Sequence, residues 1–414
     1  MNILFLTDNF FPERNAAASR VYERACYWVK WGHQVTVITC TPNFPEGKVF
    51  KGYKNKWYQV ENIDGIRVVR IKTFIAANKG FFLRIIDSIS FTIPAIIAGL
   101  FQQKPDVVVA TSPSLFAAVA GLVVAKIRRL PFVMEVSDLW PASIIGVGAM
   151  KESFLIRCLE KLELFLYRHA ASLIVLSPAF QENLISRNIS ADKIHVVING
   201  VDMTRYYPRP PELELAKQYQ ITADHFVVGY IGTHGMAHAL ENILHSAELL
   251  KHQPNIKFLF VGAGAARDEL MREAEKKALN NVCFVPSQAK EKIADFWSLC
   301  HIALVHLKNS PVFAEVIPSK IFEAMGMGLP IVIAAPAGVA VSIVEDDNVG
   351  VSVEPENPKL LAHTINHFFE NPGQLEVLAK NSYKKAPNFS REQQAKNFIL
   401  VLKQTLTTVP NNHE

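Results

Sequence analysis

The chain has 414 residues, of which half are hydrophobic and a fifth are charged. This composition excludes a disordered protein, and the length fits two domains better than one core. The five cysteines lie far apart and form no C-x-x-C pair, so we expect buried thiols in a reducing cytosol. Residues 1–200 hold 23 Lys and Arg against 15 Asp and Glu, and residues 201–414 hold 20 against 23. The basic first half indicates an anionic ligand or surface, unless the difference only reflects solvated faces.

Along the first half, strands and helices are predicted to alternate. Residues 2–7 form a buried strand, followed by a loop, a helix that ends at Gly32 and the strand HQVTVIT. Further continuous apolar strands are IRVVRIK, DVVVAT, FVMEV, SLIVLS and IHVVI. Strands of this kind belong to parallel sheets that are covered on both faces. The apolar stretches that start at Ile89 and Leu115 are shorter than the roughly 20 residues of a membrane-spanning helix, so we expect two buried helices. No basic leader precedes the first apolar run, so we expect no cleaved signal peptide.

The same alternation starts again after the proline-rich stretch YYPRPPELE. The predicted strands are FVVGYI, IKFLFVG, VCFVP, IALVHL and PIVIAA, and the helices begin near Ala237, Ala266, Glu291 and Ser319. The sequence therefore predicts an α/β protein with two Rossmann-like, doubly wound domains, residues 1–200 and 201–388, that face each other across a cleft. Residues 389–414 are expected to form a last helix, opened by a Ser-x-x-Gln capping pattern, that packs back toward the first domain.

Ligands of open parallel sheets bind beyond the carboxyl ends of the strands, and two predicted strands of the second domain end in glycine loops. Gly232, Thr233, His234 and Gly235 follow FVVGYI, and G-A-G at 262–264, with glycines Gly262 and Gly264, follows IKFLFV. Glycine lets backbone N–H groups approach a ligand closely. Neither loop matches a dinucleotide or ATP fingerprint, and small residues also serve packing at such turns.

A third loop, EVIPSKIFEAMGMGLP from Glu315, carries more polar residues. Pro318 and Ser319 are predicted to start a helix, and Lys320 there opposes the helix dipole unless an anion such as a diphosphate lies at that end. Glu323 lies one turn further along, and Glu315 precedes the helix, so both could accept hydrogen bonds from sugar hydroxyls. The alternative is a solvated helix start with incidental glutamates.

These residues resemble the E-x7-E motif of the retaining glycosyltransferases of family 4, which have the GT-B fold. The resemblance covers nearly the whole chain, through WGHQVTVIT, INGVD, GYIGTHG and PSKIFEAM. The segments DLWP and GTHGMAHALEN resemble the WbuB-type subgroup of O-antigen and capsule enzymes, which is N-acetyl-L-fucosaminyltransferase-like. This implies transfer of an N-acetylfucosamine-like sugar from a UDP-sugar to a polyprenyl-diphosphate-linked sugar in lipopolysaccharide or capsule biosynthesis. It also implies a cytoplasmic enzyme peripherally associated with the inner membrane.

The family pattern also implies roles in the second domain. Glu323 would hold the nucleotide ribose, and Glu315 would contact the donor sugar and act in catalysis. Gly232–Gly235 and Ser319–Lys320 would take the diphosphate. The backbone of Val285 would contact the nucleobase, beside the glycines of the second loop.

The sequence departs from the family in several places. The usual Arg and Lys after the first strand of the second domain are missing, so Arg20 becomes a candidate phosphate contact. Asn15 stands where a Gly-Gly turn is common. Asp138 could bind the acceptor hydroxyl or take its proton. Trp140 could stack on a sugar ring or pack in a core.

The implied mechanism uses no protein nucleophile and depends on positioning and on stabilising the leaving diphosphate. No D-x-D pair occurs, so we expect a metal-independent transferase with no cofactor besides its nucleotide sugar. The pairs His234/His238 and His363/His367 have i,i+4 spacing but no third ligand. We therefore expect solvated or phosphate-facing histidines rather than zinc ligands.

The segment between Lys48 and Arg84 interleaves basic and aromatic residues, namely Lys51, Lys54, Lys56, Arg67, Arg70, Lys72 and Lys79 with Phe50, Tyr53, Trp57, Phe74, Phe81 and Phe82. Such a mixture suits anionic lipid, where each basic residue contributes about 1 kcal/mol. A strand with one solvated face would also explain part of it. No nucleic-acid-binding module accompanies these residues.

Two other functions stay open from the sequence. A sugar-nucleotide epimerase can share this architecture, and a catalytically silent subunit could have kept the nucleotide site. The set of Glu315, Lys320 and Glu323 argues against the silent subunit. The identity of the sugars depends on loop shapes that no motif encodes.

Overall fold

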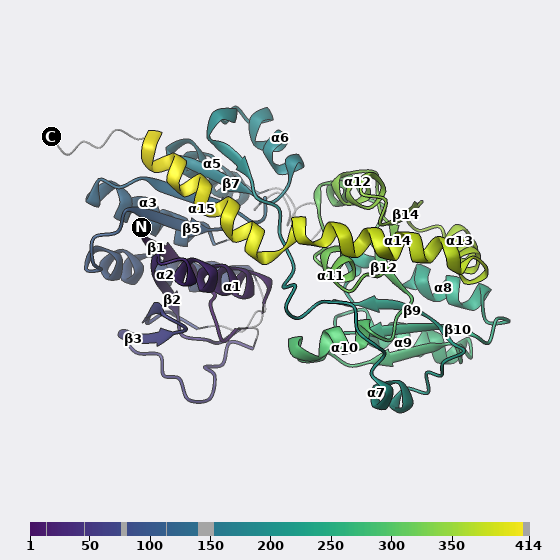
Figure 1. The fold of residues 1–414 in the computed structure, drawn as a ribbon. Coiled ribbons are helices and arrows are strands. Elements are labelled where there is room, and N and C mark those ends of the chain that lie inside the picture. Colours follow the sequence, from purple (N-terminus) through teal and green to yellow (C-terminus); the bar gives the residue numbers. More distant parts are fainter. Residues whose placement is uncertain (14, 45, 76–80, 113, 140–152, 409–414) are drawn as a thin grey trace. The chain divides into compact units, whose positions relative to one another are not determined.

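The computed structural model describes residues 1–408 except 14, 45, 76–80, 113 and 140–152. The chain divides into two compact units (Figure 1). The first unit comprises Met1–Ile198 and the C-terminal segment from Gln394, and the second unit comprises Asn199–Gln393. The chain passes between the units after Ile198 and again within the first turn of its last helix.

The first unit is built on an eight-stranded sheet of order β3-β4-β2-β1-β5-β6-β7-β8. Its strands are β1 Asn2–Leu6, β2 Gln34–Cys40, β3 Tyr58–Ile63, β4 Ile66–Ile71, β5 Val107–Thr111, β6 Phe132–Val136, β7 Ser172–Val175 and β8 Ile194–Val196. The predicted strands are confirmed as parallel neighbours. The sequence missed β3, which pairs antiparallel with β4 at the edge. Its residues YQVENI are alternately half-buried and exposed, so it lacks the continuous apolar run of a central strand.

The helices of the first unit are α1 Ala16–Lys30, α2 Phe81–Leu100, α3 Leu115–Arg128, α5 Phe154–His169, α6 Pro178–Ser186 and α15 Arg391–Thr408. From Gln394 onward α15 packs on α1. The indole N–H of Trp28 donates to the carbonyl of Ala395 over 3.1 Å, and the rings of Trp28 and Phe398 lie 5.2 Å apart.

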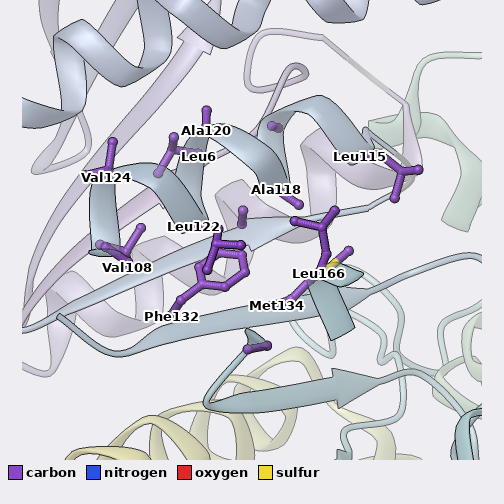
Figure 2. Close-up of a cluster of buried hydrophobic side chains, with 14 of the residues drawn as sticks. Leu6, Val108, Leu115, Ala118, Ala120, Leu122, Val124, Phe132, Met134 and Leu166 are labelled. Carbon is purple, nitrogen blue, oxygen red and sulfur yellow. The ribbon is translucent and has the colours of Figure 1, made fainter. Parts of the chain in front are cut away.

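Helix α3 is buried against the sheet, as the sequence predicts (Figure 2). Its Leu122 lies with Phe132 and Met134 of β6 and Val108 of β5 in one apolar cluster. A Cβ at Gly121 would stand 2.9 Å from the Phe132 ring, so glycine allows the helix to approach the sheet closely.

The prediction of a second buried helix is wrong for α2, because only one of its faces is buried. Phe91, Ala95 and Ala98 are buried, but a row of isoleucines on the opposite face is exposed. The apolar stretch lacks a polar face, and hydrophobicity alone cannot tell a buried helix from one with an uncovered apolar side. Among the described residues, no helix is long and apolar enough to span a bilayer. The prediction of buried thiols is confirmed for Cys40 and Cys300, but Cys26 and Cys283 are half-buried and Cys158 is exposed.

The second unit holds a six-stranded sheet, all parallel, of order β11-β10-β9-β12-β13-β14. Its strands are β9 Phe226–Ile231, β10 Ile256–Val261, β11 Val282–Val285, β12 Ile302–His306, β13 Ile331–Ala334 and β14 Gly350–Val353. The sequence analysis did not predict β14 at the sheet edge, because its residues GVSV include a glycine and a half-buried serine and form no continuous apolar run.

The α-helices of the second unit are α7 Leu213–Gln218, α8 Glu241–Leu249, α9 Arg267–Lys276, α10 Ile293–Trp297, α11 Lys320–Gly326, α12 Val339–Asp346, α13 Pro358–Glu370 and α14 Pro372–Lys385. The helix predicted from Ala237 begins later. Met236–His238 form a 3-10 turn, and Ala239 with φ 42° separates it from α8.

Candidate functional site

In the second unit, the loops after β9 and β10 are hydrogen-bonded to each other. The N–H of Gly232 donates to Val261 over 2.9 Å, and the N–H of His234 donates to Ala263 over 2.9 Å. The two glycine loops therefore lie beside each other.

A side chain at each glycine of these loops would meet a different neighbour. A Cβ at Gly262 would stand 1.9 Å from the Gly232 carbonyl oxygen, and one at Gly264 would stand 2.3 Å from the His234 carbonyl oxygen. Both positions also have positive φ, so packing of loop on loop explains them fully. Gly232 also has a positive φ, of 146°, but a Cβ there would stand 3.1 Å from the Nζ of Lys320 rather than against the neighbouring loop.

Lys320 is the first residue of α11 and is buried, with 7% of its side chain exposed. Its Nζ has no hydrogen-bond partner among the described residues. The ammonium group lies 3.6 Å from the ring centroid of Tyr230 at the end of β9. Burial lowers the pKa of Lys320 to about 7, although the nearby charge of Glu323 opposes that shift. Within the described part of the chain, the buried amino group of Lys320 thus has no acceptor for its hydrogens when it is charged.

Glu323 lies one turn further along α11 and is half-buried. Its Oε2 accepts a hydrogen bond of 3.1 Å from the indole N–H of Trp297 in α10. Burial raises the pKa of Glu323, while that hydrogen bond and the charges of Lys290, Lys320 and Arg391 lower it in part.

Three histidines surround this lysine. His234 and His306 are buried, and their ring nitrogens have no hydrogen-bond partner among the described residues. His238 Nδ1 lies 3.2 Å from the carbonyl oxygen of His306. Burial, with the charge of Lys320 adding to it, lowers the pKa of all three to about 4, so they are neutral near pH 7. Of the two predicted environments, solvent or a phosphate, His234 is therefore excluded from the first, whereas His363 and His367 are exposed.

The part of the chain that the structure describes holds no group of three or more His, Cys, Asp or Glu suited to a metal ion.

The remaining predicted residues of the second unit lie around α11 and the glycine loops. Ser319 precedes the helix as its N-cap without a side-chain cap bond, so the helix begins two residues later than predicted from Pro318. Glu315 ends the 3-10 helix Pro311–Glu315 and is half-buried. Thr233 is exposed and Gly235 is half-buried.

Val285 lies at the end of β11. Its side chain is fully buried, and its carbonyl accepts a 3.1 Å hydrogen bond from the N–H of Gly262.

In the first unit, Arg20 belongs to a buried ion-pair network. Its Nε donates to Glu135 over 3.1 Å and its Nη2 to Ser137 over 2.5 Å, while Arg24 donates twice to Glu135, over 2.9 and 2.8 Å. Burial alone would raise the pKa of Glu135, but the charges of Arg24 and Arg20 lower it to about 2. Arg20 is thus held by a carboxylate that the sequence did not single out.

The other predicted residues of the first unit have local partners. Asn15 caps α1, accepting from the N–H of Ala18 over 2.8 Å and donating to the side chain of Asn9 over 2.8 Å. Asp138 follows β6 and is half-buried, and its carbonyl accepts from Ser112 over 3.4 Å. Trp140 lies outside the described residues.

Three residues of the second-unit site were missed. Tyr230 and His306 occupy the last or second-to-last position of β9 and β12, which is the edge where ligands of such sheets bind, so their strand positions could have revealed them. Trp297 reaches Glu323 from a different helix, and no sequence pattern signals that contact.

The comparisons with known proteins agree with this architecture. Residues 15–200 match the family described as glycosyl transferase 4-like domain, and residues 211–385 match the family described as glycosyl transferases group 1. An Escherichia coli K12 glycosyl transferase named for colanic acid biosynthesis, WcaI, is 24% identical over 377 residues, which are 88% of this chain and 91% of that protein.

Solved structures show the fold. Sucrose-phosphate synthase from Thermosynechococcus elongatus has a TM-score of 0.76 at 16% identity and covers 99% of this chain and 100% of its own. Anabaena HepE in complex with UDP-glucose has a TM-score of 0.72 at 19% identity and covers 98% and 100%. The predicted pair of Rossmann-like domains is confirmed. The two family matches together place this chain among the glycosyltransferases of group 1, as an enzyme of the GT-B fold with a glycosyl transferase 4-like first domain.

Proposed function

We propose that this glycosyltransferase is a retaining enzyme that moves an N-acetylfucosamine-like sugar from a UDP-sugar to a polyprenyl-diphosphate-linked sugar. The reaction would serve the synthesis of a surface polysaccharide such as an O-antigen or a capsule, at the cytoplasmic face of the inner membrane. WcaI, named for colanic acid, supports a polysaccharide product. So does a Bacillus subtilis protein named for teichuronic acid biosynthesis, 26% identical over 48% of this chain and 49% of that protein. HepE, solved with UDP and with UDP-glucose, supports a UDP-linked donor.

The observation that carries the proposal is the buried Lys320 ammonium group, which has no acceptor among the residues that the structure describes. Leaving a buried charge unpaired is unfavourable, so its presence makes physical sense if a ligand supplies the missing anion. The space beside it is kept open by Gly232, where a side chain would crowd the Nζ. A diphosphate has the charge and the acceptor oxygens that fit this position.

In the proposed reaction, the acceptor hydroxyl bonds to the anomeric carbon while the bond from that carbon to the UDP oxygen breaks on the same face. The hydroxyl proton passes to the departing diphosphate oxygen, or to Asp138 as the second candidate. Lys320 balances the charge that develops on the diphosphate, Glu323 accepts from the ribose and Glu315 contacts the sugar hydroxyls. The site then binds its donor without a metal ion.

Two variants test this assignment. Glu323→Ala is expected to weaken UDP binding about tenfold or more, because a hydrogen bond to a charged group is lost. Glu315→Ala is expected to reduce transfer more than binding. Calorimetry with UDP and a transfer assay with a UDP-sugar panel measure the two effects. The matched control is Glu291→Ala, an exposed glutamate of the same unit that should behave as wild type.

If both variants bound UDP and transferred sugar like wild type, the site would have to lie elsewhere. A further incubation with UDP-sugar alone separates transfer from epimerisation, because a transferase should leave the donor nearly intact without an acceptor.

A further inference from the structure

Helix α2 of the first unit presents an apolar stripe to solvent. In the described part of α2 from residue 86 onward, the exposed residues are all isoleucines: Ile86, Ile89, Ile93 and Ile97, with exposures of 49, 48, 69 and 53%. Phe101, directly after the helix, is 83% exposed. The spacing of three to four residues puts these side chains on one face, over about 20 Å of helix.

This stripe is not a by-product of poor packing. The opposite face of α2 is fixed against α3, where a Cβ at Gly99 would stand 2.8 Å from Val124. Arg128 of α3 donates to the carbonyls of Gly99 and Gln102 at the end of α2 over 3.1 and 2.9 Å. The helix is therefore held firmly, and its apolar side faces outward (Figure 1 shows α2 beside α3 in the first unit).

The chain from Ser88 to Gln103 contains no Asp, Glu, Lys or Arg. A helix that faces water normally carries charged side chains on its outer face. A contiguous exposed apolar surface of this kind marks an interaction site.

A cavity beside the stripe adds aromatic and basic groups. It measures about 650 Å³ and lies between α2 and the segments on either side of β3 and β4, with Trp57, Lys72, Phe74, Ser90 and Pro94 in its wall. The N–H of Phe74 donates to the hydroxyl of Ser90 over 2.8 Å, which ties this wall to α2. Among the described residues that line the cavity there is no carboxylate.

The rim of this cavity is basic. Lys54, Lys56 and Lys72 are exposed, and the Nζ of Lys72 lies 4.7 Å from the ring centroid of Trp57, itself 74% exposed. Asn55, between the first two lysines, donates to the carbonyl of Thr73 over 2.8 Å, so the lysines are held beside the cavity.

We propose that the isoleucine stripe of α2 inserts into the acyl boundary of an anionic lipid bilayer, while the basic and aromatic rim of the adjacent cavity contacts the lipid headgroups. Apolar side chains flanked by lysine and tryptophan are the combination that suits a membrane interface. This inference deepens the membrane location of the proposed function and names the surface responsible for it.

The surface differs from the one the sequence predicts. Arg70, at the middle of the predicted basic and aromatic segment, is buried and donates to Glu61 and to the carbonyls of Cys40 and Phe11, so it cannot face lipid. Lys79 lies outside the described residues. We therefore assign the lipid contact to Lys54, Lys56 and Lys72 together with α2, rather than to the whole segment between Lys48 and Arg84.

A second copy of the chain fits this surface less well. In a symmetric dimer the same patch meets itself, so the lysines of the rim would approach one another. Anionic headgroups neutralise them instead.

Flotation of the full chain with vesicles tests the proposal. The wild type is expected to float with phosphatidylcholine vesicles that contain 30% phosphatidylglycerol, and less with phosphatidylcholine alone. The double variant Ile93→Gln/Ile97→Gln should lose at least tenfold of the binding. Lys54→Gln/Lys72→Gln should lose about fivefold per lysine on anionic vesicles, which corresponds to about 1 kcal/mol each.

Matched controls separate this contact from unspecific effects. Ile185→Gln/Val377→Gln changes two exposed apolar residues elsewhere, and Lys359→Gln/Lys380→Gln removes two exposed charges of the second unit. Both controls should bind vesicles like wild type. Circular dichroism and UDP calorimetry show whether each variant is folded.

Wild-type flotation by the stripe variant would overturn the proposal. So would a wild-type dimer that this variant converts to a monomer without any vesicle binding, as ultracentrifugation would show. Vesicle binding needs no donor or acceptor, so failure here is distinct from failure of the proposed transfer reaction.

Discussion

Each unit buries a cluster of ionisable side chains, and the two clusters differ in whether the buried charge has a partner. In the first unit, Glu135 is fully buried but accepts from both Arg20 and Arg24, and its pKa falls to about 2. In the second unit, Lys320 is buried beside uncharged Tyr230 and neutral histidines, and its pKa falls to about 7 because the charged form is disfavoured. A satisfied network stabilises the fold, whereas an unsatisfied buried cation indicates a place for a ligand.

This contrast predicts that the two clusters respond to mutation with opposite signs. The largest effect is expected at Glu135. Glu135→Ala leaves Arg20 and Arg24 buried without their counter-charge, which should lower the free energy of unfolding of the first unit by about 3–5 kcal/mol. Urea unfolding followed by hydrogen exchange in the strands of the first unit measures it.

Glu182→Ala is the control, because this exposed glutamate of α6 should change stability by less than about 0.5 kcal/mol. Acid gives an independent check. The folded pKa of Glu135 lies below the ordinary value of 4.5, so its stabilisation is present above that pH and is lost as the pH falls toward about 2. A Glu135→Ala protein as stable as wild type at pH 7 would mean that the network is not structural.

The second effect is smaller and of opposite sign. Lys320→Met replaces a buried cation by an apolar side chain of similar length, which should raise the free energy of unfolding of the second unit by on the order of 2 kcal/mol without ligand. The same variant should bind UDP at least about tenfold more weakly, because a charge-assisted contact is lost.

Urea unfolding and calorimetry on the same sample measure both properties. Lys380→Met, at an exposed lysine of α14, is the matched control. A variant that lost stability as well as affinity would show that Lys320 is already paired in the free protein, and the comparison between the two clusters would fail.

The sequence predicted the parts of the fold that depend on local pattern. Continuous apolar runs identified the central parallel strands, because such strands are covered on both faces. The edge strands β3 and β14 were not predicted, since the first alternates in burial and the second, GVSV, lacks a continuous apolar run. The exposed side of α2 could not be predicted, because a helix rich in isoleucine looks the same whether protein covers it or not.

For the candidate site, the sequence indicated which residues to consider but not their burial or their protonation states. Motif spacing singled out Glu315, Lys320, Glu323 and the glycine loops as candidates. The burial of Lys320 and the neutral state of His234 depend on packing against β9, which no spacing encodes. The pairing of Arg20 with Glu135 joins residues 115 positions apart, so it needs the three-dimensional structure.

The smallest expected effect that distinguishes the two clusters is the pH dependence of UDP binding, which should reflect the protonation of Lys320. In the free protein this lysine has a pKa of about 7, and a bound diphosphate should raise it, because the anion favours the charged form. Binding then takes up a proton above pH 7, so the UDP dissociation constant should rise about tenfold between about pH 7 and pH 8.5. The groups that face Lys320 do not produce this trend, since His234, His238 and His306 have pKa values of about 4 and are neutral throughout.

Calorimetry at pH 8 in two buffers of different ionisation enthalpy should detect the proton that binding takes up. The variant Lys320→Arg keeps its charge over this range, because a guanidinium does not titrate there, and its affinity should be nearly independent of pH. A wild-type affinity that is flat from pH 7 to 8.5, with no proton uptake, would show that the diphosphate does not rest on this lysine. The unpaired cation of the second unit would then need another ligand, while the neutralised network of the first unit would keep its structural role.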